Sequence, residues 1–98
     1  MNNNFVYILT NFNKTVLYIG VTNNLKRRLY EHQHDIKSPL SFTKKYKAFY
    51  LIYYEYFPDI KQAITRETVL KKWNRKKKET LITEFNPEWR FLNDEIGD

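Results

Sequence analysis

Residues 16–32, with the sequence VLYIGVTNNLKRRLYEH, decide the fold. Their first part, VLYIGV, is typical of a buried strand, and Gly20 near its end predicts a bend or a close approach to its backbone. Asn23 or Asn24 is suited to cap a helix that we expect to run to about His34. The stretch therefore predicts a strand that leads directly into a basic helix.

This expected helix carries two polar side chains on the face that a helix normally buries. At about 100° per residue, Arg28 and His32 share one face with Leu25 and Leu29. An unpaired guanidinium is very costly to bury, so Arg28 requires a partner. Either a structural salt bridge or a functional site would provide one.

Two further strands are expected around this stretch. Residues 5–10 are apolar on both alternating faces, which predicts a strand covered on two sides. A short turn at residues 11–14 joins this strand to the one at residues 16–21 in an antiparallel hairpin. A loop at residues 35–47 then leads to a tyrosine-rich strand at residues 49–56.

Helices are expected to dominate the second half of the chain. Asp59 is suited to cap a helix that ends near Trp73, and another helix fits residues 75–85. An Asn-Pro pair then predicts a short last helix over residues 86–92, because proline is favoured at the first helical position. The polar tail at residues 93–98 is expected to fray.

Length and composition favour one compact domain. The 98 residues suit a single core, which we place at about residues 5–92, and 42% of them are hydrophobic. The order of two strands, a helix, a strand and then helices predicts an α/β or α+β layered domain. Its centre would be a small three-stranded sheet with helices packed on it.

Charge and cysteine content narrow the classes of function. The formal net charge of +6 favours DNA, RNA or an acidic membrane surface as partner, although an ordinary basic protein has the same balance. The chain has no cysteine, which excludes a disulfide scaffold and a thiolate zinc site and favours the reducing cytoplasm. The longest apolar run, residues 48–54, is too short to span a bilayer, and the first residues lack the features of a signal peptide.

Three more polar side chains lie where apolar ones are expected. Glu67 is near the middle of the apolar face of the helix that Asp59 caps. That face consists of Ile60, Ala63, Ile64, Glu67 and Leu70. Tyr7 and Tyr18 lie in neighbouring strands and need hydrogen-bond partners if they are buried. Each of these residues alone fits an ordinary core or a structural ion pair. Together with Arg28 and His32, they form an acid–base and metal-binding set suited to phosphodiester chemistry.

Two short motifs resemble those of the GIY-YIG nuclease superfamily. They are VYI at residues 6–8 and YIG at residues 18–20, and the latter is followed by TNNLKRR at residues 22–28. The resemblance covers about residues 5–92 and is closest to the small stand-alone, URI-like bacterial proteins, although Val6 stands where the family usually has glycine. It implies a three-stranded antiparallel sheet flanked by helices. It also implies metal-dependent cleavage of a DNA phosphodiester.

The resemblance also implies roles for single residues. Tyr7 and Tyr18 match the two motif tyrosines, and Arg28 matches the arginine of the first helix. His32 matches a histidine found in part of the family. Glu67 is similar to the single carboxylate that holds one divalent ion, Mg²⁺ or Mn²⁺.

The implied chemistry leaves the general base open. Arg28 suits stabilisation of the charge on the phosphorane. Tyr7 or Tyr18 suits orientation of the attacking water, but a tyrosine of ordinary pKa, about 10, needs nearby positive charge to act as a base. His32 is a further candidate for proton transfer or phosphate binding. Asn86 resembles a late asparagine near the site, and its capping role explains it equally well.

Two basic clusters are candidates for contact with phosphates, and a solvated surface is the alternative for both. The junction cluster consists of Lys71, Lys72, Arg75, Lys76, Lys77 and Lys78, and the second cluster of Lys44, Lys45 and Lys47. Trp73 within the junction cluster suits either stacking on a base or the core.

These features favour a DNA endonuclease whose specificity comes from DNA structure or from a partner protein. A non-catalytic nucleic-acid-binding module on the same scaffold is the alternative, and an RNA- or ribosome-associated protein is a third. A nuclease requires Glu67, Arg28 and both tyrosines to meet at an accessible cleft. A binding module needs only the basic surface.

Overall fold

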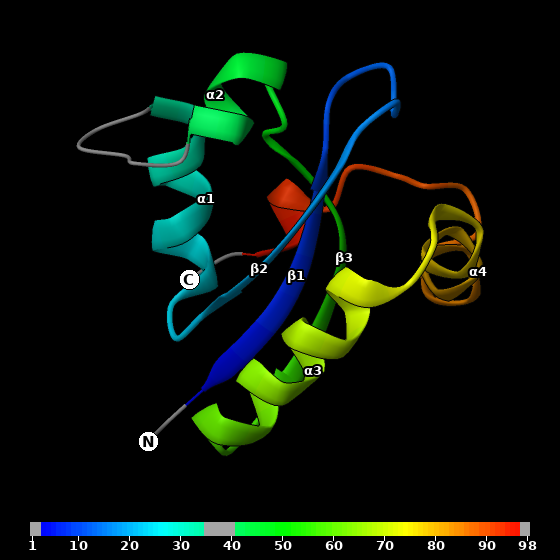
Figure 1. Ribbon diagram of the computed structural model, residues 1–98. Helices are drawn as coiled ribbons and strands as arrows, with labels where there is room; N and C mark the ends of the chain where they lie inside the picture. The colour runs from blue at the N-terminus through cyan, green and yellow to red at the C-terminus, as the bar shows by residue number, and fades with distance from the viewer. Residues whose placement is uncertain (1–2, 35–40, 97–98) are drawn as a thin grey trace.

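The computed structural model describes residues 3–34 and 41–96, which form a three-stranded sheet surrounded by four helices (Figure 1). The strands are β1 (Asn4–Thr10), β2 (Leu17–Thr22) and β3 (Tyr50–Phe57). The helices are α1 (Leu25–His34), α2 (Ser41–Tyr46), α3 (Ile60–Lys72) and α4 (Arg75–Phe85), followed by a 3₁₀ turn, η1 (Asn93–Glu95). Within the described ranges, no helix has the length and apolar character that a membrane span needs.

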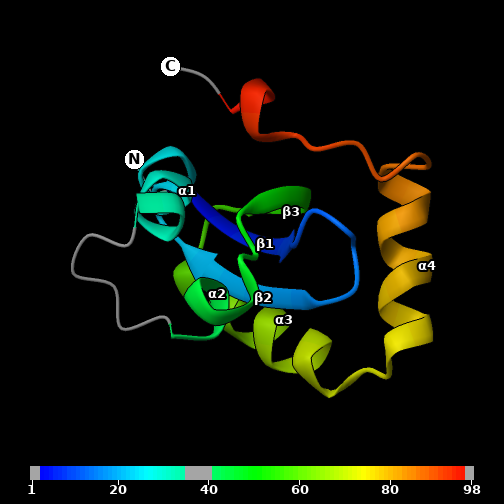
Figure 2. The same cartoon turned by 90° about the horizontal axis from the view of Figure 1, so that it is seen from above.

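The sheet is antiparallel, with β1 in the centre and β2 and β3 on either side. This confirms the fold class, an α+β domain built on a small three-stranded antiparallel sheet. Nearly all of β1 is buried because helices cover both faces of the sheet. In Figure 2, α1 and α3 lie on opposite faces.

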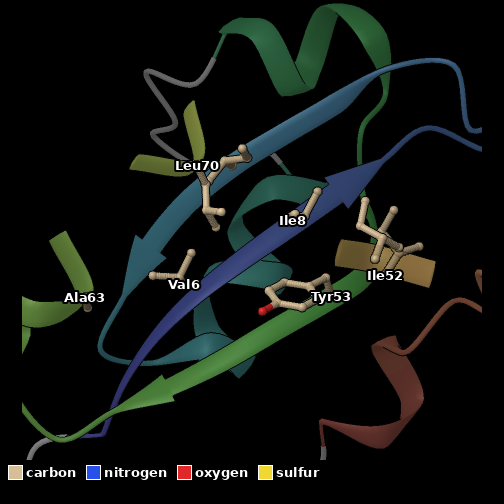
Figure 3. Close-up of a cluster of buried hydrophobic side chains, with 8 residues drawn as sticks. Val6, Ile8, Ile52, Tyr53, Ala63 and Leu70 are labelled. Carbon is tan, nitrogen blue, oxygen red and sulfur yellow. The ribbon is translucent and has the colours of Figure 1, made fainter. Parts of the chain in front are cut away.

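One face of the sheet packs on α3 and α4. Val6, Ile8 and Ile52 of the sheet contact Ala63 and Leu70 of α3 in a fully buried cluster (Figure 3). On the opposite face, a second cluster joins β1 and β3 to the leucines of α1. Burying one such aliphatic side chain contributes about 1.5–3 kcal/mol, so the two clusters hold the helices to the sheet.

The inward face of α3 is shifted from the predicted one. Ala63 and Leu70 are buried as expected, but Ile60 and Ile64 are exposed. Arg66 is half-buried instead, because its Nε donates a hydrogen bond to Glu55 of β3 at 2.9 Å. The side of α3 that meets the sheet therefore includes an ion pair that the apolar pattern did not predict.

The predicted loop at residues 35–47 is wrong in its second half. Residues 35–40 lie outside the described residues, and residues 41–46 form α2. Lys47 ends α2 in a left-handed conformation with φ of 54°, and the Ala48 N–H donates to the Thr43 carbonyl at 3.0 Å. Ala48 is fully buried, so the core holds the end of α2.

The predicted last helix over residues 86–92 is also wrong, because the side chain of Asn86 holds an irregular turn. Its Nδ2 donates to the carbonyls of Ile52 at 3.1 Å and Arg90 at 2.8 Å, and its Oδ1 accepts from the Arg90 N–H at 3.0 Å. Leu92 then donates its N–H to the Leu51 carbonyl at 2.7 Å. The chain therefore returns along β3 instead of continuing as a helix.

The segment that was expected to fray is attached to the sheet up to η1. The side chain of Asn93 accepts from the Leu51 N–H at 2.9 Å and donates to the Phe49 carbonyl at 3.0 Å. Sequence reasoning missed these bonds because they join residues more than forty positions apart. Residues 97 and 98 lie outside the described residues.

Gly20 is required by the tyrosine that lies opposite it. Tyr7 of β1 pairs with Gly20 of β2, and a Cβ atom at Gly20 would lie 2.5 Å from the Tyr7 hydroxyl oxygen. This confirms the predicted close approach to the Gly20 backbone. The Tyr7 ring occupies the space that any other side chain at this position would fill.

Gly20→Ala is expected to lower the free energy of unfolding by about 1–3 kcal/mol, because the buried Tyr7 ring must shift. Urea denaturation measures the change. In a Tyr7→Leu background the same substitution is expected to cost much less, since leucine does not reach over Gly20. Equal costs in the two backgrounds would contradict this packing.

Candidate active site

Three buried side chains, one each from β1, α1 and α2, are joined by hydrogen bonds. The Tyr7 hydroxyl oxygen lies 2.9 Å from His32 Nε2, and His32 Nδ1 lies 3.1 Å from the Thr43 hydroxyl oxygen. Each of the three residues is only 1% exposed. We call Tyr7, His32 and Thr43 the inner layer.

Burial keeps the inner layer uncharged near neutral pH. It raises the pKa of the Tyr7 phenol, and Tyr18 adds to the rise, while the charge of Arg28 opposes it. Burial first, and then Arg28, lowers the pKa of His32 to about 4. His32 is therefore neutral at pH 7, and Tyr7 keeps its proton.

Tyr18 lies on β2, one of the two edge strands, and packs against the inner layer. Its ring centroid is 6.3 Å from that of Tyr7 and 5.5 Å from that of His32. Tyr18 is half-buried, whereas Tyr7 is sealed. Burial raises the pKa of Tyr18, and the positive charges of Lys71 and Arg28 oppose the rise.

Arg28 reaches the site from α1 and keeps unused hydrogen-bonding capacity. Its side chain is 31% exposed, and the nearest carboxylate, Glu31, is 3.7 Å from Nε. That Nε is buried and donates no hydrogen bond within the described residues. The structural salt bridge between Arg28 and Glu67 is not formed here, and the only carboxylate that Arg28 pairs with among the described residues is Glu31 of its own helix, at a distance too long for a hydrogen bond.

Glu67 approaches the same place from α3. Its side chain is 18% exposed and pairs with Lys71, one turn later, at 3.2 Å. The charge of Glu67 raises the pKa of Tyr7 and of Tyr18, and that of Arg28 lowers both. Glu67 and Arg28 are therefore both close enough to act electrostatically on the two phenols. We call Tyr18, Arg28 and Glu67 the outer layer.

The donor set fits a metal ion that shares its ligands with a substrate. The described residues contain no group of three or more His, Asp or Glu side chains that could hold an ion alone. Mg²⁺ commonly binds through one or two carboxylates and fills its other positions with water and phosphate oxygens. Glu67 is partly exposed and acts on the same two phenols as Arg28, so it is suited to that kind of binding.

Asn86 is not brought to the outer layer. Its side-chain hydrogen bonds all go to the backbone of Ile52 and Arg90, on β3 and the C-terminal segment. These contacts support a structural role for Asn86 and not a role in the site. Asn86 follows the end of α4, however, and does not begin a helix as the sequence predicted.

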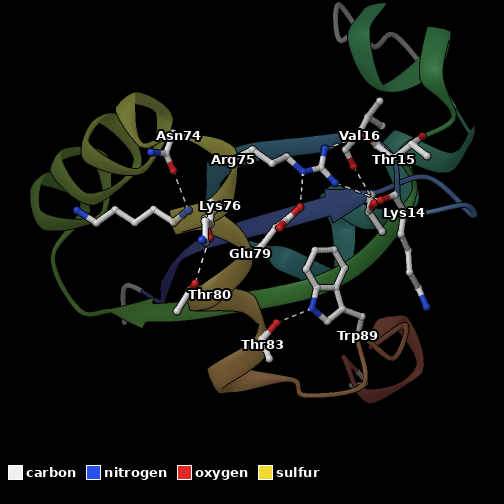
Figure 4. Close-up of polar contacts among 12 residues, drawn as sticks. Lys14, Thr15, Val16, Asn74, Arg75, Lys76, Glu79, Thr80, Thr83 and Trp89 are labelled. Atoms are coloured by element: carbon white, nitrogen blue, oxygen red, sulfur yellow. Dashed lines mark hydrogen bonds and ion pairs between the residues drawn. The ribbon is translucent and has the colours of Figure 1, made fainter.

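Part of the junction cluster is used to hold the fold together. Arg75 donates to the carbonyls of Thr15 at 2.7 Å and Lys14 at 3.2 Å and pairs with Glu79 at 2.9 Å, which fixes α4 to the β1–β2 turn (Figure 4). Lys77 lies over the Trp73 ring at 4.3 Å.

Trp73 itself packs on the core beside α3, which is one of its two predicted roles.

Lys72 and Lys76 are exposed around the junction, and Lys44 and Lys45 are exposed on α2. The lysines of the junction cluster begin at Lys71, whose charge reaches Tyr18. The Lys71 end of the cluster therefore adjoins the outer layer.

Comparison with known proteins places the chain in a family. The GIY-YIG catalytic domain matches residues 3–80. The chain belongs to the GIY-YIG family. A UPF0213 protein of Syntrophus aciditrophicus is 38% identical over 88 residues, which cover 90% of this chain and 98% of the relative. A UPF0213 protein of Clostridium perfringens is 35% identical over 80 residues, which cover 82% of this chain and 83% of that one.

A solved structure agrees with the fold. The solution NMR structure of a UPF0213 protein from Bacillus halodurans is similar with a TM-score of 0.52 and 27% identity over 83% of each chain. The resemblance that the motifs at residues 6–8 and 18–20 predicted is therefore confirmed. GIY-YIG proteins form a nuclease family, and nucleic acid is the substrate class that membership implies.

The depressed pKa of His32 predicts a loss of stability in acid. Between pH of about 6.5 and about 4 the unfolded chain binds a proton at this residue that the folded chain does not. The free energy of unfolding is therefore expected to fall as the pH drops through this window, by on the order of 3 kcal/mol. Urea denaturation at a series of pH values measures the slope.

His34→Gln, which removes the exposed histidine of the same helix, should retain this slope, and His32→Gln should lose most of it. An NMR titration that places the midpoint of His32 near its ordinary value, about 6.5, would contradict the sealed inner layer.

Proposed function

We propose that this GIY-YIG protein hydrolyses phosphodiester bonds of DNA with one divalent metal ion, Mg²⁺ or Mn²⁺. The proposal depends on the outer layer, in which a phenol, a guanidinium and a carboxylate from β2, α1 and α3 act on one another at a partly exposed edge. A merely structural pair would have joined Arg28 to Glu67. Instead Glu67 contacts the exposed Lys71, and the Arg28 Nε donates no hydrogen bond within the described ranges.

Arg28 is proposed to bind the scissile phosphate. A guanidinium is planar and donates in parallel to two phosphate oxygens, and it stays charged at every relevant pH. Its buried Nε gains the hydrogen bond that it lacks, and this favours a bound phosphate. The same contact stabilises the negative charge that develops on the phosphoryl group.

Glu67 is proposed to hold the metal ion. When bound, the ion would polarise the phosphoryl group and neutralise charge on the leaving oxygen. Lys71 is 53% exposed, so it is free to move from Glu67 towards solvent or a phosphate when the carboxylate takes another partner. The proposal therefore requires no rearrangement of the backbone of α3.

Tyr18 is proposed to orient the attacking water. It is the tyrosine of the pair that solvent reaches, whereas Tyr7 lies beneath it at 1% exposure. Hydrolysis joins the water oxygen to phosphorus and breaks one P–O ester bond, and a proton of the water ends on the released alcohol. The inner layer holds Tyr18 in place by packing and stays uncharged, so it does not repel the phosphate.

DNA structure is proposed to direct binding more than base sequence does. Lys71, Lys72 and Lys76 lie around the junction of α3 and α4, and Lys71 contacts Glu67 of the outer layer. Lysine contacts with phosphates position a duplex without reading its bases. A partner protein is the alternative source of specificity.

The test is cleavage of a panel of duplex, nicked, forked and single-stranded DNA in the presence of Mg²⁺ or Mn²⁺. Arg28→Ala and Glu67→Gln are each expected to lower kcat by on the order of 100-fold or more while DNA binding is largely retained. Matched controls are Arg27→Ala, a neighbouring arginine that also pairs with Glu31, and Glu84→Gln, an exposed glutamate of α4.

Both control variants should cleave like the wild type. If the wild-type protein binds these substrates and cleaves none of them, the non-catalytic binding module replaces this proposal. If Arg27→Ala is as damaging as Arg28→Ala, a general loss of positive charge explains the effect and Arg28 has no special place.

A further inference from the structure

We propose that Thr43 is a positioning residue, whose hydroxyl accepts a hydrogen bond from His32 Nδ1–H and so keeps the Nε2 lone pair directed at the Tyr7 hydroxyl. These hydrogen bonds are present whether or not the protein cleaves DNA. Their effect on catalysis rests on the proposed function. Neither the family comparison nor the motifs assign a role to Thr43 or to α2.

The direction of the hydrogen bonds follows from the Tyr7 proton. Tyr7 is buried and keeps its proton at neutral pH, so the hydroxyl must find an acceptor. Within the described residues, the hydrogen-bond partner of this hydroxyl is His32 Nε2, at 2.9 Å. A neutral imidazole that accepts at Nε2 carries its proton at Nδ1.

Thr43 is placed to receive that Nδ1 proton. Its hydroxyl oxygen is 3.1 Å from Nδ1, and a threonine hydroxyl accepts as readily as it donates. The reverse tautomer would turn an Nε2 proton and the Tyr7 proton towards each other, and one would remain without an acceptor in a sealed site. The arrangement in which Thr43 accepts satisfies both donors.

The backbone around Thr43 fixes its position. Its carbonyl accepts the Ala48 N–H at 3.0 Å where α2 ends, and Ala48 is fully buried. The core therefore holds the hydroxyl at a set distance from α1. A hydroxyl that merely filled space here would be replaceable by a group of the same shape.

The expected consequence is on the phenols above. Without an acceptor for Nδ1–H, the His32 ring is no longer held in one orientation, and the Tyr7 hydroxyl loses a fixed partner. Tyr7 packs against Tyr18, so disorder in the inner layer reaches the outer layer. Loss of the hydrogen-bond partner that orients a metal-ligating histidine costs roughly 10- to 100-fold in activity, and we expect a similar loss for His32, which is oriented in the same way.

The first experiment observes His32 directly by ¹H–¹⁵N NMR of the imidazole rings. The chain has two histidines, and a His34→Gln background leaves one set of ring signals. The wild-type protein is expected to show one slowly exchanging Nδ1–H. Thr43→Val should lose this protected signal, Thr43→Ser should keep it, and Thr80→Val, at an exposed threonine of α4, should leave it unchanged.

A ring proton on Nε2 in the wild type would overturn the proposal, and so would a protected Nδ1–H that survives in Thr43→Val. Thr43→Ser retains the hydroxyl, so it keeps the test valid if the valine variant folds poorly. This experiment does not require nuclease activity, so its outcome is separate from that of the cleavage assay.

The second experiment compares kinetics on a DNA substrate that the wild type cleaves. Thr43→Val is expected to lower kcat roughly 10- to 100-fold with little change in KM, and Thr43→Ser to restore most of the rate. A serine variant as slow as the valine variant, or a valine variant as fast as the wild type, would refute the positioning role.

Discussion

The contact on which the rest of the structure depends is that of Tyr7 with Gly20 and His32. The Tyr7 ring lies over the Gly20 backbone, and its hydroxyl is 2.9 Å from His32 Nε2. This single side chain thereby joins the central strand, β1, to β2 and to α1. Gly20, which follows Tyr18 and Ile19 in β2, is therefore a steric requirement, because any Cβ atom at that position would meet the Tyr7 ring.

Two layers of polar residues with opposite properties follow from this contact. The inner layer is sealed, joined by hydrogen bonds and uncharged near neutral pH, which burial enforces on both Tyr7 and His32. The outer layer keeps a charged guanidinium with a buried nitrogen that lacks a hydrogen bond in the described part of the chain. Such a nitrogen costs about 1–3 kcal/mol, and proteins retain such costs mainly at sites that bind something.

The sequence predicted what local patterns determine. Strand and helix positions followed from alternation, caps and the 3.6-residue period, and the inward positions of His32, Leu25 and Leu29 followed from the face of α1. What it could not predict depends on partners distant in the chain. The side chain of Asn86 donates to the carbonyl of Ile52, and Arg66 of α3 donates to Glu55 of β3.

Part of the candidate site could also be predicted from the sequence, and part of it could not. The motif residues could be named because the family resemblance marks them, and the structure brings Tyr7, Tyr18, Arg28, His32 and Glu67 together while it places Asn86 elsewhere. Thr43 was missed because the sequence predicts a loop where the structure has the short helix α2. No local pattern distinguishes its buried hydroxyl from the exposed side chains around it.

The most direct test of the central claim is paramagnetic broadening of the ¹⁵N-labelled protein by Mn²⁺ with a DNA oligonucleotide present. If the outer layer is a metal-dependent phosphodiester site, broadening should centre on the amides of Tyr18, Arg28 and Glu67 and should disappear in Glu67→Gln. Broadening that is centred on α4, or that persists unchanged in Glu67→Gln, would contradict the account.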